Sequence, residues 1–283
     1  MKEIKKIIPS IKVNMGGNLI DQPLPINGID YFDPFLLIHH WKSTMPGNQE
    51  QKEVGVGPHP HRGFSPVTFI FKGEVNHHDS LGNNASVSEG GTQWMFAGSG
   101  ITHSERPSKK LALSGGELEF IQFWINAPSK NKMDEPFYLP LSKDQTPTIN
   151  KKDYSIQIVC GQHLNTKGII KYYTPLNLFR VDINASATLN LNFPENHNTI
   201  IYLLDGELAI NNETCLAKEM VLFKNKGELI KIKSKLKTRF IVLSGLPLKE
   251  PVVSYGPFVM NTKNEIIEAL NDSQSGKLGN LIE

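Results

Sequence analysis

Two similar stretches occur about forty residues apart in the sequence: Pro58-His59-Pro60-His61-Arg62-Gly63-Phe64 and Gly98-Ser99-Gly100-Ile101-Thr102-His103-Ser104-Glu105. Each stretch carries two metal-binding side chains two positions apart, His59 and His61 in the first and His103 and Glu105 in the second. Residues at that spacing point to the same face of a β-strand. Two such strands lying side by side would direct three imidazoles and one carboxylate at one point. The spacing therefore predicts a β fold that carries a mononuclear metal site.

The sequence around these stretches is divided into short pieces by 23 glycines and 18 prolines. The segments we expect as strands are rich in aromatic and β-branched residues; they are 67–71, 118–125, 154–159, 178–183, 188–193, 199–204 and 239–243. Many short strands with turn residues between them are typical of a sandwich or barrel, so we predict an all-β fold. Only residues 264–271 show clear helical periodicity. The tail from Ser273 to Glu283 is predicted to be only partly ordered.

An internal repeat predicts two copies of one barrel. Phe69-Ile70-Phe71-Lys72-Gly73-Glu74-Val75 is similar to Tyr202-Leu203-Leu204-Asp205-Gly206-Glu207-Leu208, and both read as a strand, a glycine turn and a strand. A proline-containing interval at 128–150 resembles a linker. We therefore expect a metal-binding domain at residues 1–135 and a second domain without metal ligands at residues 136–283. In the second copy Asn192 and Pro194 align with His59 and His61.

The composition excludes some classes of function. The formal net charge is +2, so no bulk charge draws the protein to nucleic acid or to a membrane surface. The N-terminus lacks the apolar core of a signal peptide, and we expect a cytoplasmic protein. The two cysteines, Cys160 and Cys215, fit no zinc or redox motif. Basic residues recur at every second position from Lys231 to Arg239, which indicates a solvated face or a docking strip for an acidic protein partner.

Three imidazoles and a carboxylate suit a borderline divalent metal, with iron, zinc, nickel, copper, manganese and cobalt all possible. A structural zinc site usually has four ligands and often includes thiolates, whereas these four groups would leave a six-coordinate metal with two open positions. Open positions favour redox or Lewis-acid chemistry. Because neighbouring residues of a strand point to opposite faces, at most one of His77 and His78 can face the pocket. We expect His40 to be structural or to lie behind the metal ligands. The aromatic residues Trp94, Phe96, Phe120 and Trp124 are expected in the barrel core more often than as a platform for substrate.

Together these motifs resemble the pirin family of bicupins. The resemblance is carried by His59-Pro60-His61-Arg62-Gly63-Phe64, by the segment from Gly73 to Asn83, and by the segment from Gln93 to Glu105. It extends to Asp33-Pro34-Phe35-Leu36-Leu37 and to the segment from Glu250 to Thr262, and so covers nearly the whole chain. The resemblance implies two cupin barrels packed face to face. It also implies one metal, usually Fe2+, in the N-terminal barrel, with His59, His61, His103 and Glu105 as ligands.

The resemblance also implies a function and shows one departure. Several bacterial pirins are similar in having quercetin 2,3-dioxygenase activity, in which dioxygen cleaves a flavonol and Glu105 would act as the base. Animal pirin is described instead as a nuclear transcriptional co-regulator, so a metal-dependent regulatory protein without turnover is the alternative. Where pirins commonly have Gly-Phe-Glu-Thr-Val, this chain has Gly63-Phe64-Ser65-Pro66-Val67. We expect this change to alter the polarity or charge around the pocket and to leave the metal ligands intact.

Overall fold

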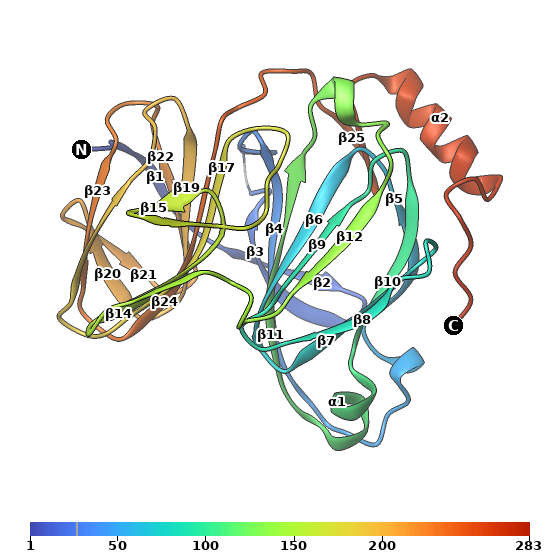
Figure 1. Cartoon of the computed structure of the whole chain (residues 1–283), viewed down its shortest axis with the longest axis horizontal. Coiled ribbons are helices and arrows are strands. Elements are labelled where there is room, and N and C mark those ends of the chain that lie inside the picture. Colours follow the sequence, from blue (N-terminus) through green and yellow to red (C-terminus); the bar gives the residue numbers. More distant parts are fainter. Residues whose placement is uncertain (27) are drawn as a thin grey trace. The chain divides into compact units, whose positions relative to one another are not determined.

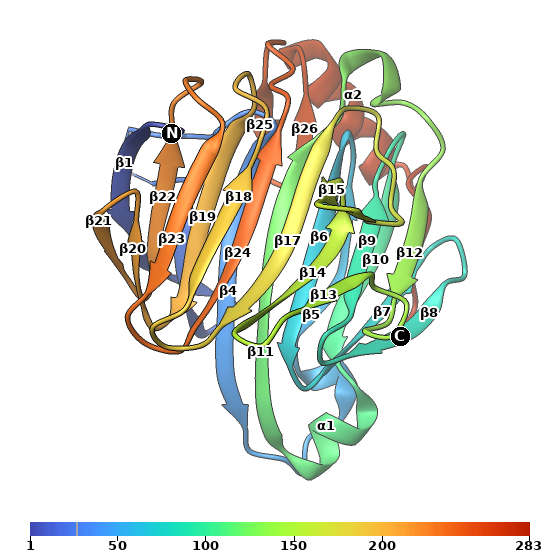
Figure 2. The same cartoon turned by 60° about the vertical axis from the view of Figure 1, so that its left-hand side comes forward.

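Strands separated by tight turns build most of the chain, as the sequence predicts. The computed structural model describes residues 1–26 and 28–283. The seven segments expected as strands and the expected C-terminal helix are all present. Within the described residues, no helix has the length and apolar character needed to cross a membrane. Figures 1 and 2 show the strands from two directions.

The chain forms two compact units. The N-terminal segment belongs to the unit built mainly from the second half of the chain, and the C-terminal segment belongs to the unit built mainly from the first half. The first unit contains Val13–Ile20, Phe35–Lys143 and Lys249–Glu283, and the second contains Met1–Lys12, Asp21–Pro34 and Asp144–Leu248. The break at Lys143 falls inside the proline-containing interval that the sequence marks as a linker. The domain boundary between residues 135 and 136 stays a prediction.

The first unit pairs a seven-stranded sheet, in the order β12-β9-β6-β11-β4-β3-β2, with a four-stranded sheet in the order β5-β10-β7-β8. Strands β2 and β3 each have residues in both units. The elements are β2 (Ile11–Met15), β3 (Asn18–Leu24), β4 (Phe35–Met45), η1 (Gln51–Glu53), β5 (Val56–His61), β6 (Phe64–Lys72), β7 (Glu74–Asp79), β8 (Asn84–Ser88), β9 (Thr92–Phe96), β10 (Ile101–Pro107), α1 (Lys109–Ser114), β11 (Gly116–Asn126), η2 (Ser129–Asn131), β12 (Phe137–Leu141), β25 (Val253–Tyr255), β26 (Phe258–Met260) and α2 (Lys263–Gln274).

The second unit has the same plan, with a seven-stranded sheet in the order β1-β22-β19-β24-β17-β14-β13 and a four-stranded sheet in the order β18-β23-β20-β21. The long strands β19, β24 and β17 run side by side in Figure 2. The elements are β1 (Ile4–Pro9), β13 (Thr148–Asn150), β14 (Tyr154–Cys160), β15 (Gln162–His163), β16 (Thr166–Lys167), β17 (Leu176–Ile183), β18 (Thr188–Asn192), β19 (Asn198–Asp205), β20 (Glu207–Ile210), β21 (Glu213–Leu216), β22 (Glu219–Phe223), β23 (Leu229–Ser234) and β24 (Thr238–Gly245).

The internal repeat is confirmed at its turns. Gly73 joins β6 to β7 with φ +75°, and Gly206 joins β19 to β20 with φ +81°. This left-handed backbone is one that glycine adopts without strain. A Cβ at Gly73 would lie 2.6 Å from the carbonyl oxygen of Glu117, and one at Gly206 would lie 2.6 Å from that of Lys237. Both turns therefore require glycine for conformation and for space.

Two short segments differ from expectation. Helix α1 was not predicted, because a helix of six residues is too short to show periodicity; it begins after Ser108, whose hydroxyl accepts a hydrogen bond from the Leu111 N–H. The tail after α2, predicted to be only partly ordered, makes defined contacts. Leu278 is buried, and its carbonyl accepts hydrogen bonds from the hydroxyls of Ser80 and Thr102.

Candidate metal centre

The two sequence stretches become neighbouring antiparallel strands of the first unit. Strand β10 pairs with β5 so that His103 lies opposite His59, and it pairs on its other side with β7 so that Glu105 lies opposite His77. Because side chains alternate along a strand, His103 and Glu105 share one face of β10 and His59 and His61 share one face of β5. Hydrogen-bonded strand pairing is what brings the distant motifs together.

The three imidazoles form a compact group. One nitrogen from each of His59, His61 and His103 lies within 4.8 Å of the others. The ring centroids of His59 and His103 are 4.4 Å apart, and those of His61 and His103 are 5.1 Å apart. His61 and His103 are buried, whereas His59 is half-buried. This spacing of nitrogen donors suits a single metal ion.

Hydrogen bonds orient these rings toward a common point. The Nδ1 of His59 lies 2.8 Å from the carbonyl oxygen of Gly57, and the Nδ1 of His61 lies 3.0 Å from that of Pro257. A carbonyl only accepts, so each Nδ1 carries the proton and each Nε2 keeps a free lone pair. The Nε2 of His103 is buried and has no hydrogen-bond partner. A buried polar atom left in this way is well explained by a metal ligand.

The surroundings keep two of the three imidazoles neutral. Burial lowers the pKa of His61 and of His103 well below the usual value for histidine, and neighbouring imidazoles lower both further. Neutral imidazole is the form that binds a metal. The site is therefore ready to take up a cation near neutral pH without first losing protons from these two rings.

Glu105 lies on the same strand face but has other partners in this structure. Its Oε2 accepts a hydrogen bond of 2.7 Å from Gln122 Nε2, and its Oε1 accepts one of 3.3 Å from the Thr68 hydroxyl. The Oε1 of Gln122 in turn accepts from the indole N–H of Trp124 at 3.2 Å. The close group of nitrogen donors consists of the three histidines, so the role of Glu105 as a ligand remains a proposal.

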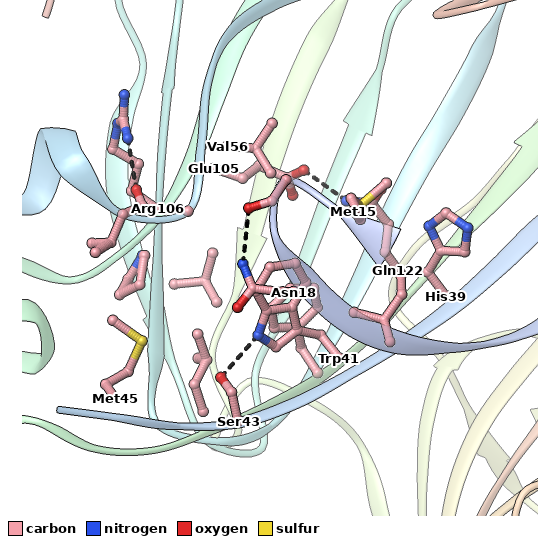
Figure 3. Close-up of a pocket in the computed structure, with 18 of the residues that line it drawn as sticks. Met15, Asn18, His39, Trp41, Ser43, Met45, Val56, Glu105, Arg106 and Gln122 are labelled. Carbon is pink, nitrogen blue, oxygen red and sulfur yellow. Dashed lines mark hydrogen bonds between the residues drawn. The ribbon is translucent and has the colours of Figure 1, made fainter. Parts of the chain in front are cut away.

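A cavity of about 500 Å³ opens beside the histidines. His59, His61 and Glu105 are among the residues that line it. Figure 3 shows Glu105 and Gln122 in the cavity wall together with Trp41 and Met45. The rings of Trp41 and Phe120 stack 5.7 Å apart with an interplanar angle of 13°. The volume is in the range of small-molecule sites, and the wall combines apolar and aromatic side chains with polar groups that could orient a ligand.

Of the other residues singled out in the sequence, some lie in the core and some line the cavity. Trp94 and Phe96 are fully buried, while Phe120 and Trp124 line the cavity, so the expected core role is confirmed only for the first two. His40 is completely buried, with its Nε2 3.2 Å from Glu119 Oε1, which confirms a structural role.

Of the paired histidines, only His77 faces the metal-centre side. His77 is buried with its Nδ1 3.3 Å from that of His103, whereas His78 is half-buried and lines a separate polar cleft. The signal for His77 was present in the sequence as a third pair of polar, metal-capable residues at strand spacing, His77 and Asp79. Its partner could not be identified without the register of β7 on β10.

The departure from the common pirin sequence does not change the pocket lining. In the β6–β11 register, Ser65 lies opposite Ile125, Pro66 opposite Trp124 and Thr68 opposite Gln122. Ser65 is thus on the strand face that points away from Thr68 and Glu105. Neither Ser65 nor Pro66 is among the described residues that line the cavity. The expected change of polarity at the pocket is therefore not found in its lining.

Comparison with known proteins identifies the relatives of this chain. The Pirin family model matches residues 19–125, and the model of the Pirin C-terminal cupin domain matches residues 178–279. A Pseudomonas aeruginosa protein provisionally named as a quercetin 2,3-dioxygenase is 35% identical over 250 residues, which cover 87% of each chain. The crystal structure of a quercetin 2,3-dioxygenase from Acinetobacter baumannii is 33% identical, with a TM-score of 0.94 and 100% of both chains covered.

A more distant structure shows the same fold. The bacterial pirin YhhW from Escherichia coli, solved in complex with nickel(II), is 20% identical with a TM-score of 0.66, over 87% of this chain and 97% of that one. The two barrels and the histidine group of one of them define a bicupin. The chain belongs to the pirin family.

Proposed function

We propose that this protein is a metal-dependent dioxygenase that opens the heterocycle of a flavonol such as quercetin. The observation that carries the proposal is the close group of three imidazoles, two of which line a cavity of small-molecule size. The relatives from P. aeruginosa and A. baumannii with quercetin dioxygenase names support the choice of reaction.

The residues fit a single divalent metal. His59, His61 and His103 would hold it through Nε2, and the Nε2 of buried His103, which has no hydrogen-bond partner, supports this assignment. We propose Glu105 as the fourth ligand, since it shares the strand face of His103 and lines the same cavity. Fe2+ suits this donor set, and the nickel(II) complex of the E. coli relative shows that a pirin can hold another metal of this class. When bound, the metal supplies Lewis acidity and brings dioxygen near the substrate.

The chain supplies substrate binding and one proton acceptor. The stacked Trp41 and Phe120 and the indole of Trp124 provide apolar surface for a flat flavonol. Glu105 would take the proton of the substrate hydroxyl, because its carboxylate lines the cavity near the histidines. The hydrogen bonds from Gln122 and Thr68 fix the orientation of that carboxylate. Overall, one flavonol and one dioxygen give a ring-opened product and carbon monoxide.

Oxygen uptake and loss of flavonol absorbance by the iron-loaded protein test the proposal. Both signals should be present in the wild-type protein and lost in His61→Ala and Glu105→Ala. They should persist in the control His78→Ala, because His78 lies outside the cavity. Iron-loaded protein that turns over no flavonol would overturn the proposed reaction and favour the regulatory alternative, whereas activity retained in both site variants would remove these residues from the mechanism.

A further inference from the structure

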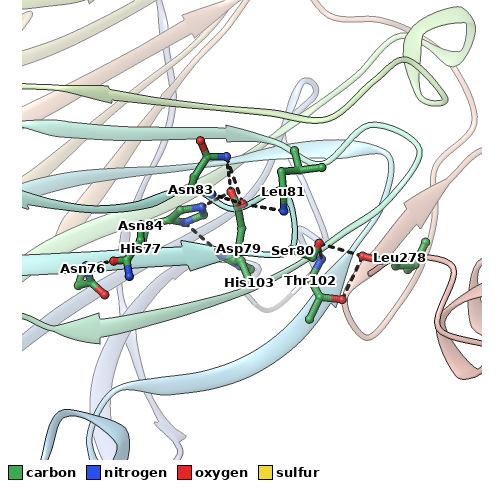
Figure 4. A network of polar contacts seen from close by, with 10 residues as sticks. All are labelled: Asn76, His77, Asp79, Ser80, Leu81, Asn83, Asn84, Thr102, His103 and Leu278. Carbon is green, nitrogen blue, oxygen red and sulfur yellow. Dashed lines mark hydrogen bonds and ion pairs between the residues drawn. The ribbon is translucent and has the colours of Figure 1, made fainter. Parts of the chain in front are cut away.

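Behind His103, on the neighbouring strand β7, lies a row of buried polar side chains that the proposed reaction does not use. The Nδ1 of His77 is 3.3 Å from the Nδ1 of His103, and the Nε2 of His77 is 2.7 Å from Asp79 Oδ2. Figure 4 shows His77 between the other two side chains. Each of the three residues is 1% exposed. Their hydrogen bonds are therefore made to protein groups and not to bulk water, and these groups set the positions of their protons.

Asp79 faces only hydrogen-bond donors. Its Oδ1 accepts from the backbone N–H groups of Leu81 and Asn83, at 2.9 and 3.1 Å, and the Asn83 amide donates to both of its oxygens. Burial raises the pKa of Asp79, but the hydrogen bonds from His77 and Asn83 outweigh it and leave the pKa below the usual value. Asp79 is therefore an ionised acceptor, and the short contact to His77 requires a proton on His77 Nε2.

The contact between His77 and His103 bears on which nitrogen of His103 carries the proton. His77 Nε2 donates to Asp79, and where this is the one proton on the ring, the Nδ1 lone pair of His77 faces His103 Nδ1. His103 must then donate from Nδ1, which leaves the unpartnered Nε2 bare on the side of the histidine group. The ring of Tyr138 stacks on His77 with centroids 3.7 Å apart and an interplanar angle of 4°, so His77 cannot easily turn away.

We propose that His77 and Asp79 are positioning residues that hold His103 in the tautomer with its proton on Nδ1 and its Nε2 free for the metal. The inference deepens the proposed function, since it depends on His103 being a metal ligand. Partners behind metal-binding histidines commonly change metal affinity by about 10- to 100-fold when they are removed. The structure assigns that role here to an imidazole backed by a carboxylate.

The variant Asp79→Asn should move the proton of each histidine to its other ring nitrogen. An asparagine must turn its oxygen toward the donors of Leu81 and Asn83, so its NH2 group faces His77 Nε2. His77 then accepts at Nε2, donates from Nδ1 to His103, and leaves the His103 proton on Nε2, where it opposes metal binding. The second variant, His77→Phe, keeps a ring against Tyr138 and removes the acceptor. Its matched control is His78→Phe, the adjacent residue on the opposite face of β7.

The experiment measures Ni2+ affinity by competition with a chromophoric chelator and the histidine tautomers of the metal-free protein by 15N NMR. We expect about 10- to 100-fold weaker Ni2+ binding in Asp79→Asn and His77→Phe, and wild-type affinity in His78→Phe. The His103 proton should be on Nδ1 in the wild-type protein and on Nε2 in Asp79→Asn. Circular dichroism verifies that each variant folds. If Asp79→Asn does not fold, the Ni2+ affinity of His77→Phe and the His103 tautomer of the wild-type protein still test the inference.

Wild-type Ni2+ affinity in the folded variants, or a wild-type His103 with its proton on Nε2, would overturn this inference. Failure of the proposed function looks different: the wild-type protein would bind Ni2+ and show the expected tautomer, yet its iron form would consume no flavonol.

Discussion

In the first unit, strands β5, β10 and β7 lie in the same order as β18, β23 and β20 in the second unit. Their inward positions differ in chemistry. In the second unit Leu189 lies opposite Ile232 and Leu191 opposite Ile230, and all four belong to one continuous apolar core. In the first unit the corresponding pairing of β5 and β10 places His59 opposite His103.

The difference shows that a barrel with a binding site loses some of the stability that close packing of its interior would provide. Aliphatic side chains that interlock across two strands leave little space and contribute stability. On the corresponding strands of the first unit, imidazoles contribute nitrogen donors instead, and they lie beside an open cavity. One strand plan therefore supports a packed core in one unit and a binding site in the other.

The largest expected effect comes from making the interior of the first unit resemble that of the second. His61→Leu should lower metal affinity by more than about 100-fold and abolish flavonol turnover, because a ligand is lost and not merely its support. The metal-free protein should stay folded, since leucine carries no polar group to bury. Metal analysis after dialysis measures the loss. The control His197→Leu replaces a buried histidine of the second unit and should keep full metal content. Metal retained by His61→Leu would refute the ligand assignment.

Truncating a core side chain of the second unit should lower the stability of the protein and leave metal binding unchanged. Ile232→Ala should lower the free energy of unfolding by about 2–5 kcal/mol, because Ile232 lies in a continuous core that cannot close the gap. Leu118→Ala, in the wall of the cavity, should cost less because one side already faces open space. Urea unfolding of the metal-free proteins gives both values. Equal losses in the two variants would contradict the contrast between a filled and an open barrel.

The pH dependence of stability should reveal histidines that are buried without a charge. Burial lowers the pKa of His39, which lines the cavity, to about 4. Because its unfolded pKa is near 6.5, the unfolded chain binds the proton first, and the contribution of His39 to stability is lost as pH falls from about 6.5 toward 4. The loss is at most about 3 kcal/mol. His39→Gln should flatten the fall between pH 7 and pH 4.5 in urea titrations of chelator-treated protein. An unchanged slope would exclude His39 as the cause.

The smallest effect tests the repeated turns. Gly73→Ala and Gly206→Ala should each destabilise the protein by about 1–3 kcal/mol, since both introduce a Cβ at positive φ. Gly206→Ala should cost more, because its Cβ would also lie 2.1 Å from the Thr238 hydroxyl. Thermal unfolding compares the two. The controls Gly16→Ala and Gly256→Ala share the positive φ but have nothing within 4 Å of the Cβ, and they isolate the part due to crowding.

Much of the site was accessible from the sequence because its signal is local. His59 and His61, and His103 and Glu105, are two residues apart, and that spacing has one simple meaning in a strand. The bonds from Gln122 and Thr68 to Glu105 were not accessible, because these residues come from β11 and β6 and meet the carboxylate only after the sheets pack. The contact of His77 with His103 depends in the same way on strand register.

Domain organisation shows a similar limit. The repeat around Gly73 and Gly206 revealed two barrels, and the interval 128–150 contains the break between the units. The return of Lys249–Glu283 to the first unit had no local signal, since which strand edge a terminal segment joins depends on the shape of surfaces far away in the chain.

From the sequence alone follow the β character of the chain, the glycine turns, the repeat and the four candidate ligands, since each rests on a period or a conformation that neighbouring residues impose. The tertiary structure decided which side chains surround these candidate ligands: His77 beside His103, the donors to Glu105 and the aromatic wall of the cavity. The physical reason is that hydrogen bonds between side chains need ångström-scale register between strands, and that register is set by the packing of the whole barrel.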